Sequence, residues 1–292
     1  MSNKRKVNIV VLSDVHLGTY GCKSKELLKY LKSINPNIVI LNGDIIDVWQ
    51  FKKYYWPKSH MKVLKHLIGW AINKNVKVYY ITGNHDEIFR KFVPFEFNGF
   101  KIVNKLVLKL DNNKKAWFFH GDVFDVTMKH SKWLTRLGAV GYDILILINN
   151  LVNYISKLMG KGKISLSKKI KNSVKKAVSY INNFEETVSE IAIKNKYDYV
   201  ICGHIHQPAI KKISNEKGET LYLNSGDWIE NMSALEYNKG KWKIYLFSQD
   251  CDINKEIINS DKKELVDKSY KEIYSELIQE FDIANIKIPT LK

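Results

Sequence analysis

The stretch Val7-Asn8-Ile9-Val10-Val11-Leu12 is followed directly by Ser13-Asp14-Val15-His16, and this junction decides the fold class. The mostly apolar, β-branched run predicts a buried strand, and the polar residues after it predict a loop. The same order recurs along the chain, with strands predicted at 38–41, 76–81, 116–119 and 199–202 and helical patterns at 25–33 and 59–73. Strands that alternate with helices in this way predict an α/β fold.

Each of these five strands ends in a polar turn that carries side chains able to bind a metal ion. These side chains are Asp14, His16, Asp44, Asn84, His85, His120, His204 and His206. Because open α/β sheets bind ligands beyond the carboxyl ends of their strands, we expect them to gather at one edge of one sheet. Taken singly, each is explained by a turn, a helix cap or a buried histidine. Five such ends in one chain indicate a shared metal site.

The ordered set D-x-H, G-D-x-x-D, G-N-H-D, H-G and G-H-x-H resembles the calcineurin-like metallophosphoesterase superfamily over residues 7–250, apart from a helical insert. The resemblance implies a β-sandwich flanked by helices (αββα) and metal-dependent hydrolysis of a phosphoester. It also implies two divalent ions bridged by Asp44, one held by Asp14, His16 and His206 and the other by Asn84, His120 and His204. Mixed oxygen and nitrogen ligands without cysteine favour Mn²⁺, with Fe or Zn as the alternatives.

His85 resembles the family's histidine that is not a metal ligand. The resemblance implies a catalytic role, in which this histidine stabilises the transition state or protonates the leaving oxygen. Asp47 and Asp86 are both candidates to orient its ring, and a purely structural histidine is the alternative. The substrate phosphate is expected to contact Asn84, His85 and His204.

The flanks of three motifs resemble the UDP-2,3-diacylglucosamine hydrolases of lipid A synthesis. The matching stretches are Ser13–Gly18, Gly43–Trp49 and His120–Asp122. This resemblance implies cleavage of a pyrophosphate to UMP and 2,3-diacylglucosamine 1-phosphate. The chain departs from that branch at His85, where the branch has an arginine, and over residues 123–132. The G-N-H-D form is the general one in the superfamily.

The composition changes after residue 125. Residues 126–196 contain no clear strand and predict two or three helices with an apolar stripe. Eleven Lys and Arg against one acid across 129–176 give this segment +10 of the formal charge of +17. We therefore predict a catalytic domain of residues 1–125 and 197–250, a helical basic and apolar insert over 126–196, and a C-terminal helix and tail over 251–292. The resemblance to the UDP-2,3-diacylglucosamine hydrolases implies that this insert is a lid, and we expect its Lys171 and Lys175 to contact the substrate.

Composition and charge limit the compartment and the partners. With 292 residues, 45% of them hydrophobic, the chain can bury a core, so global disorder is excluded. Its three cysteines match no disulfide or zinc pattern, and no segment reads as a signal peptide or a bilayer span. We expect a cytoplasmic protein that lies reversibly on the inner face of the membrane. The expected partners are a nucleotide-sugar lipid or another phosphoester, and an anionic membrane surface.

Three alternatives stay open. A phosphatase or phosphodiesterase acting on nucleotides or phosphoproteins would need no apolar lid. A membrane-peripheral scaffold would need no complete set of metal ligands. Nucleic-acid binding agrees with the net charge, but the aromatic residues of the insert lie in predicted helices and form no stacking platform. The pattern leaves the oligomeric state open.

Overall fold

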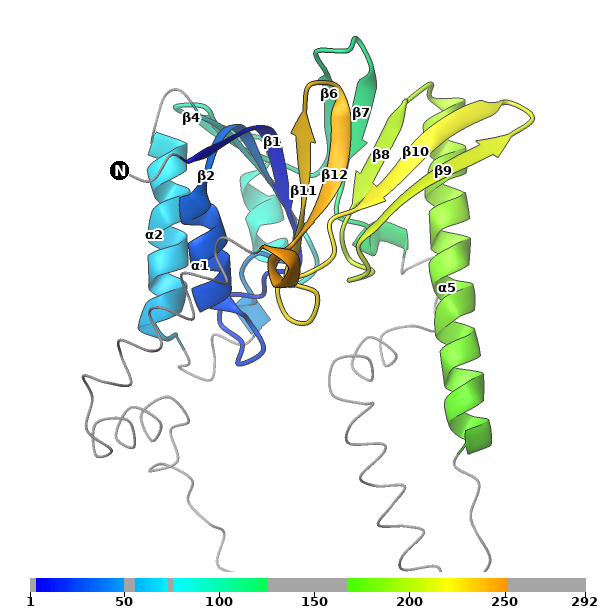
Figure 1. Ribbon diagram of the computed structural model, residues 1–292, viewed down its shortest axis with the longest axis horizontal. Coiled ribbons are helices and arrows are strands. Elements are labelled where there is room, and N and C mark those ends of the chain that lie inside the picture. Colours follow the sequence, from blue (N-terminus) through cyan, green and yellow to red (C-terminus); the bar gives the residue numbers. More distant parts are fainter. Residues whose placement is uncertain (1–3, 50–55, 73–75, 125–166, 251–292) are drawn as a thin grey trace, which may run out of the picture.

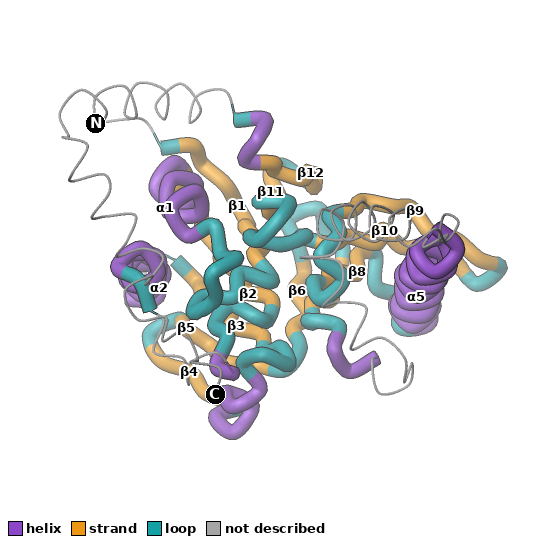
Figure 2. The backbone as a smooth tube through the Cα atoms, turned by 90° about the horizontal axis from the view of Figure 1, so that it is seen from below, coloured by secondary structure: helices purple, strands orange, loops and turns teal. Residues whose placement is uncertain are grey.

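A computed structural model of the chain describes residues 4–49, 56–72, 76–124 and 167–250. Two β-sheets pack against each other (Figure 1). Helices α1 (Ser24–Ser33) and α2 (Lys58–Ile72) cover the outer face of one sheet, and α5 (Ser167–Lys194) covers the outer face of the other, as the view from below shows (Figure 2). The predicted sandwich flanked by helices is confirmed.

The first sheet has seven strands in the order β12-β11-β1-β2-β3-β5-β4. Its central strands β1, β2 and β3 are parallel, and their carboxyl ends are in register because Leu12 pairs with Leu41 and Asn42 pairs with Ile81. Three loops of the site therefore leave the sheet side by side. The strands span β1 (Arg5–Leu12), β2 (Ile34–Asn42), β3 (Lys77–Ile81), β4 (Phe95–Phe97), β5 (Phe100–Val103), β11 (Ser233–Asn238) and β12 (Lys241–Leu246).

The second sheet has five strands in the order β6-β7-β8-β10-β9. In it β7 and β8 are parallel, with Phe118 opposite Ile201. The expectation that all five strand ends lie in one sheet was therefore wrong, since β7 and β8 belong to the second sheet. The strands span β6 (Leu106–Lys109), β7 (Lys115–Phe118), β8 (Tyr199–Cys202), β9 (Ala209–Asn215) and β10 (Gly218–Asn224).

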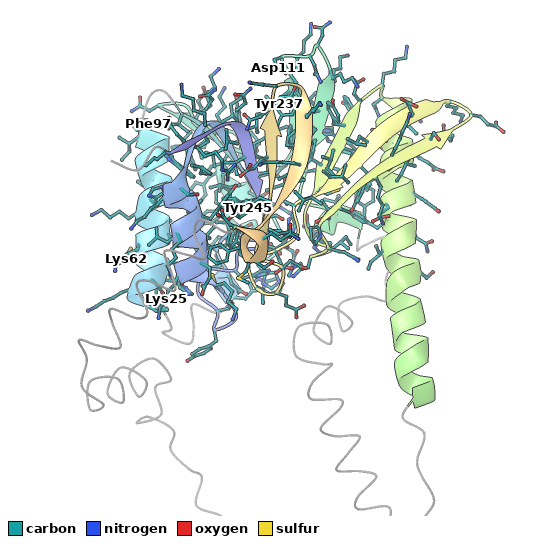
Figure 3. The ribbon with its side chains drawn as sticks, in the orientation of Figure 1. Lys25, Lys62, Phe97, Asp111, Tyr237 and Tyr245 are labelled. Carbon is teal, nitrogen blue, oxygen red and sulfur yellow. The ribbon has the colours of Figure 1, made fainter. Side chains whose placement is uncertain are left out.

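The two groups of strand ends meet because the side chain of Asn42 joins the sheets. Nδ2 of this side chain donates to the Phe119 backbone carbonyl at 3.0 Å, and the backbone carbonyl of Asn42 lies 2.9 Å from Nδ1 of His120. At the other end of the sandwich, the Tyr237 hydroxyl donates to Asp111, and these two residues lie together in Figure 3. The sheets are thus hydrogen-bonded to each other at both ends.

Alternating side chains build three apolar layers. Along β1, Ile9 and Val11 enter the core between the sheets, whereas Val10 and Leu12 pack in the core that includes α1 and α2. The third layer lies between the second sheet and α5, and it contains Phe184, Val188, Ala192, Val200 and Cys202. Burying each of the large apolar side chains contributes about 1.5–3 kcal/mol.

The structure also contains elements that the pattern did not predict. Strands β4, β9 and β11 are additional, and β2 begins at Ile34, directly after α1 ends, so Asn35-Pro36 lies inside the strand. The helices predicted over 126–166 and the C-terminal helix predicted over 251–292 lie outside the described residues. Among the described residues, no helix combines the length and apolar character needed to cross a bilayer.

Candidate metal centre

The backbone at the strand ends has an uncommon conformation. Five of the predicted ligand residues have positive φ angles between 51° and 65°, in the left-handed region that non-glycine residues seldom adopt. Such positions cost free energy and persist where surrounding structure holds them, which is common at functional sites. These residues are Asp14, His16, Asp44, His204 and His206.

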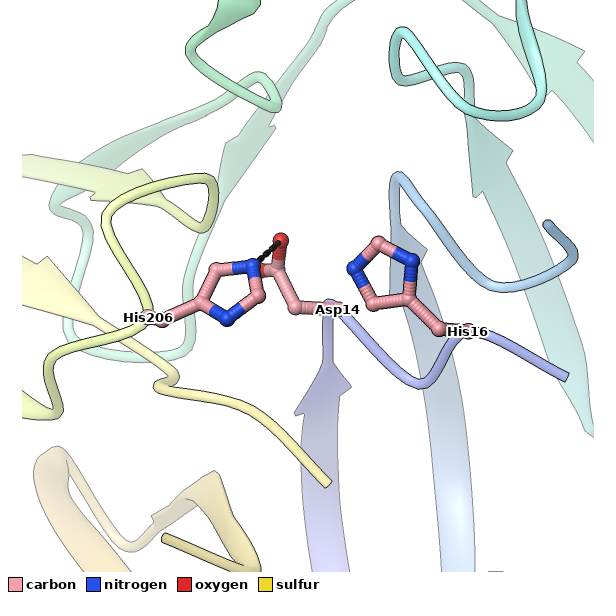
Figure 4. A group of neighbouring side chains, drawn as sticks. All are labelled: Asp14, His16 and His206. Atoms are coloured by element: carbon pink, nitrogen blue, oxygen red, sulfur yellow. Dashed lines mark ion pairs between the residues drawn. The ribbon is translucent and has the colours of Figure 1, made fainter. Parts of the chain in front are cut away.

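The first group of side chains contains Asp14, His16 and His206. Asp14 lies between the two histidines, and its Oδ1 is 3.0 Å from Nε2 of His206 (Figure 4). Burial alone would raise the pKa of Asp14, but the charge and hydrogen bond of His206 outweigh it and lower that pKa to about 2. Burial would lower the pKa of His206, and the Asp14 carboxylate instead raises it to about 9.

The second group contains Asp44, His120 and His204. Nδ1 of His120 points at the Asn42 carbonyl, which can only accept, so Nδ1 carries the proton of that hydrogen bond. Nε2 of the same ring then faces Oδ2 of Asp44 at 3.2 Å. Two acceptors face each other there, and a proton or a cation between them relieves the repulsion. In the absence of a cation, the pKa of His120 rises well above its usual value despite burial, because of the Asp44 charge.

The third group joins Asp47 to two histidines. Oδ2 of Asp47 lies 3.0 Å from Nδ1 of His85 and 3.6 Å from Nδ1 of His16. Burial would lower the pKa of His85, but its hydrogen bond to Asp47 raises it, with the charge of Asp44 adding to the effect. Of the two carboxylates predicted to orient His85, the structure therefore places Asp47 beside the ring.

Asp86, the other candidate, has a different set of partners. Its carboxylate accepts from the backbone N–H of Gly83 at 2.6 Å, from that of Ile45 at 2.9 Å and from the Tyr80 hydroxyl at 2.6 Å. These bonds tie the loop after β3 to the loop after β2. Asp86 thus maintains the spacing between the two loops that carry Asn84 and Asp44.

The glycines of the motifs leave space for the candidate ligands. A Cβ atom at Gly43 would overlap the His120 ring, and one at Gly83 would overlap the Asp44 carboxylate. At Gly203 a Cβ would lie 2.6 Å from Oδ2 of Asp14. The motifs need glycine here because side chains from other strands occupy the position of its missing Cβ.

The donor set fits a pair of divalent cations. The buried atoms His16 Nε2, Asn84 Oδ1 and His120 Nε2 have no hydrogen-bond partner among the described residues. A buried polar atom without a partner is costly, and three in one site indicate that a bound group completes their coordination. Carboxylate, imidazole and amide donors suit divalent transition metals.

Two residues that the sequence reasoning missed hold the loop of His206. Asp227 accepts from the backbone N–H of Ile229 at 2.8 Å and from the Asn231 side chain at 2.6 Å, and Asn231 in turn donates to the His206 carbonyl at 2.7 Å. The signal was present, because Gly226-Asp227 follows strand β10 just as Gly43-Asp44 follows β2.

Not every predicted site residue can be placed. Lys171 and Lys175 lie on α5, but their side chains are outside the description. Their predicted role remains a prediction. Cys22 and Cys202 are free and buried, and neither belongs to the three candidate groups.

An αββα sandwich with paired carboxylate–imidazole groups at its strand ends defines a dinuclear metallohydrolase. The family model of the calcineurin-like phosphoesterases matches residues 7–208. The chain therefore belongs to the calcineurin-like phosphoesterase family and is a metal-dependent phosphoesterase, whose family chemistry implies two divalent metal ions.

Two relatives and one solved structure illustrate the range of similarity. A UDP-2,3-diacylglucosamine hydrolase of Blochmanniella pennsylvanica is 25% identical over 80% of this chain and 93% of its own length. The DNA double-strand break repair protein Mre11 of Methanococcus maripaludis is 26% identical over 91% of this chain and 70% of its own. A solved archaeal phosphodiesterase covers 82% of this chain and 98% of its own, with 14% identity and a TM-score of 0.39.

Proposed function

We propose that this chain hydrolyses the pyrophosphate of UDP-2,3-diacylglucosamine to UMP and 2,3-diacylglucosamine 1-phosphate. The observation that carries the proposal is the similarity to hydrolases of that substrate over nearly their full length, 93% in the Blochmanniella relative. The flanks of the first, second and fourth motifs and the basic insert agree with it.

We assign one cation to Asp14, His16 and His206, the other to Asn84, His120 and His204, and the bridge to Asp44. Mn²⁺ is the proposed metal, with Fe and Zn as alternatives. When bound, such a pair supplies Lewis-acid charge and a water of lowered pKa. Asn84 and His204 also contact a phosphate oxygen in this proposal, and Lys171 and Lys175 contact the phosphates from α5.

His85 is the proposed general acid. Asp47 accepts from its Nδ1, so Nε2 is the nitrogen left to face the substrate. Burial would lower the pKa of His85, but the hydrogen bond to Asp47 raises it, which favours the protonated form that a general acid needs. Its Nε2 proton then passes to the phosphate oxygen that leaves with the acylated sugar. Asp47 fixes the ring orientation and stabilises its charge.

The substrate of this reaction is a lipid, so a location at the membrane is part of the proposal. The insert has a charge of +10 across 129–176, which attracts anionic headgroups, and its apolar stripe suits the acyl region. We propose that the chain works in the cytoplasm, reversibly bound to the inner face of the membrane.

Hydrolysis of phosphodiesters in nucleic acid is the second candidate. The similarity to Mre11 over 91% of this chain favours it, as does the formal charge of +17. The two candidates share the metal chemistry and differ in what surrounds the scissile phosphorus.

One experiment separates the candidates. The Mn²⁺-loaded protein is incubated with UDP-2,3-diacylglucosamine, with UDP-glucosamine, with bis-p-nitrophenyl phosphate and with single- and double-stranded DNA. We expect kcat/KM for the acylated substrate to exceed that for the bare sugar by about 10²-fold or more. In ¹⁸O water the label should appear in UMP, because attack falls on the phosphorus next to uridine. Label in the sugar phosphate, or a preference for DNA, would contradict the proposal.

A further inference from the structure

A groove on the outer face of the second sheet is lined in part by His120 of the candidate metal centre. One cavity of about 360 Å³ is lined by His120 and Gly121 and by the aromatic residues Trp117, Phe119 and Phe124. A second cavity of about 140 Å³ adjoins it, since Lys105 and Trp117 line both. The pair is called the β7 groove here.

The wall of the β7 groove follows from strand periodicity. Residues 117 and 119 point to the outer face, whereas Ala116 and Phe118 enter the core between the sheets. The Trp117 and Phe119 rings stack with centroids 4.2 Å apart and an interplanar angle of 26°. Beyond Trp117 the groove continues along Val107, Ile191 and Tyr197. The larger cavity is therefore lined mainly by carbon, whereas Lys105 and Asn195 add polar atoms to the smaller one.

Four polar residues that line the larger cavity are hydrogen-bonded to one another. Arg90 donates to the Asp122 carboxylate at 2.5 Å and to the Thr82 hydroxyl at 3.3 Å, and Thr82 donates to the Asn104 side chain at 3.0 Å. A nucleobase would be recognised through hydrogen bonds to its edge, and these groups are engaged elsewhere. An aliphatic chain needs no such partners and fills an elongated apolar groove.

We infer that the β7 groove holds one acyl chain of the substrate. The inference rests on the proposed function. It adds a location for one acyl chain of the substrate, on the face of the second sheet beside α5. A chain whose sugar phosphate lies at the metal centre would enter past His120 and Gly121 and run along Trp117 toward Tyr197.

Filling the groove tests this inference. Lys105 is exposed where the two cavities meet, so Lys105→Phe adds bulk there, and Lys105→Ala removes the cation without adding volume. Lys109→Phe is the matched control, since Lys109 is exposed on β6 and lines neither cavity. We expect Lys105→Phe to lower the ratio of kcat/KM for acylated over bare UDP-sugar by about 10-fold or more, with Lys105→Ala and Lys109→Phe within about threefold of the wild type. An unchanged ratio in Lys105→Phe would overturn the inference.

A binding measurement keeps this test separate from that of the proposed function. Bromine quenches indole fluorescence on contact, so 12-bromododecyl phosphate should quench the wild type, and Trp117→Phe should remove that component. Quenching at Trp117 by the brominated chain supports the groove as an alkyl site even if UDP-2,3-diacylglucosamine is not hydrolysed, in which case the proposed function fails alone. Quenching that is identical in Trp117→Phe, or a Trp117 signal that responds to UMP in place of the alkyl phosphate, would overturn the inference.

Discussion

Oδ2 of Asp47 lies 3.0 Å from Nδ1 of His85, and this contact joins the second motif to the third. Asp47 is almost fully buried, while His85 is partly exposed and faces the exposed ring of Trp49. A buried carboxylate therefore holds an accessible imidazole in one orientation and raises its pKa. This is the arrangement that a general acid needs.

A double-mutant cycle tests this pair. His85→Ala should lower kcat by about 10²–10⁴-fold and retain both metals, because in the proposed mechanism His85 donates a proton and is not a metal ligand. Asp47→Asn should lower kcat by about 10–10²-fold, since the ring loses its orientation. The double variant should be no slower than His85→Ala alone, because both residues act through one group. Steady-state kinetics and metal analysis measure these effects, and loss of metal from His85→Ala would refute the assigned role.

Asp44 is predicted to bridge the two cations. Asp44→Asn should reduce turnover by about 10³-fold or more and lower the metal stoichiometry from two toward one. In the proposed site the negative charge of the Asp44 carboxylate, whose Oδ2 faces His120, holds both cations, and an amide lacks that charge. Asp86→Asn is the matched control, since that carboxylate is also buried in the site but bonds Tyr80 and backbone N–H groups. The control should keep both metals and lose about 1–3 kcal/mol of stability. Equal loss of metal in Asp44→Asn and Asp86→Asn would contradict the bridging role predicted for Asp44.

Gly83 tests the need for glycine in the third motif. A Cβ at this position would overlap Asp44, so Gly83→Ala should cost about 1–3 kcal/mol of stability and about 10²-fold in kcat. Gly69→Ala on α2 is the matched control, because its Cβ would meet nothing within 4 Å. The control should be neutral or stabilising by up to about 1 kcal/mol. Chemical denaturation and kinetics of the two variants measure the difference, and full activity in Gly83→Ala would show that the loop adjusts freely.

His60 predicts a pH dependence of stability. Its Nδ1 accepts from the Gly18 N–H at 2.9 Å, and burial lowers its pKa to about 4 from an ordinary value of 6.5. Between pH 6.5 and pH 4 the imidazole of His60 is protonated in the unfolded chain but not in the folded chain. The contribution of His60 to the free energy of unfolding is therefore fully present above pH 6.5 and is lost as the pH falls toward 4. The loss is on the order of 3 kcal/mol.

His60→Gln removes this titration. The free energy of unfolding of the wild type should fall relative to that of His60→Gln between pH 7 and pH 4. Urea denaturation at several pH values measures the difference. If the free energy of unfolding changes with pH equally in the two proteins, His60 does not make the predicted pH-dependent contribution to stability.

Binding to a membrane surface is predicted from the charge of the insert. Flotation with anionic vesicles should recover the protein at low salt and lose most of it at high salt, because headgroup attraction is screened. Neutral vesicles are the control and should recover less protein at either salt concentration. Absence from anionic vesicles at low salt would refute the prediction.

Local pattern was sufficient for the central strands and for the candidate ligands. An apolar run such as Val7–Leu12 can only be buried, and its carboxyl end must carry the next polar residues to the rim of a sheet. Strand β11 escaped prediction because Glu236 makes the segment look polar. In the fold Glu236 is fully buried and paired with Arg5 of β1 at 2.5 Å and with the Tyr30 hydroxyl at 3.0 Å. Its partners are more than 200 residues away in the chain.

The sequence by itself therefore determined the α/β class, the donor residues and their division between five strand ends, because strand periodicity and glycine turns are local properties. The αββα sandwich followed only from the resemblance of the motifs to the metallophosphoesterases. Only the tertiary structure decided that the ends come from two sheets joined through Asn42, that Asp47 and not Asp86 orients His85, and that Asp227 holds the His206 loop. Each of these depends on a contact between segments that leave different strands. Such contacts arise from packing the two sheets together, and no spacing along the chain encodes them.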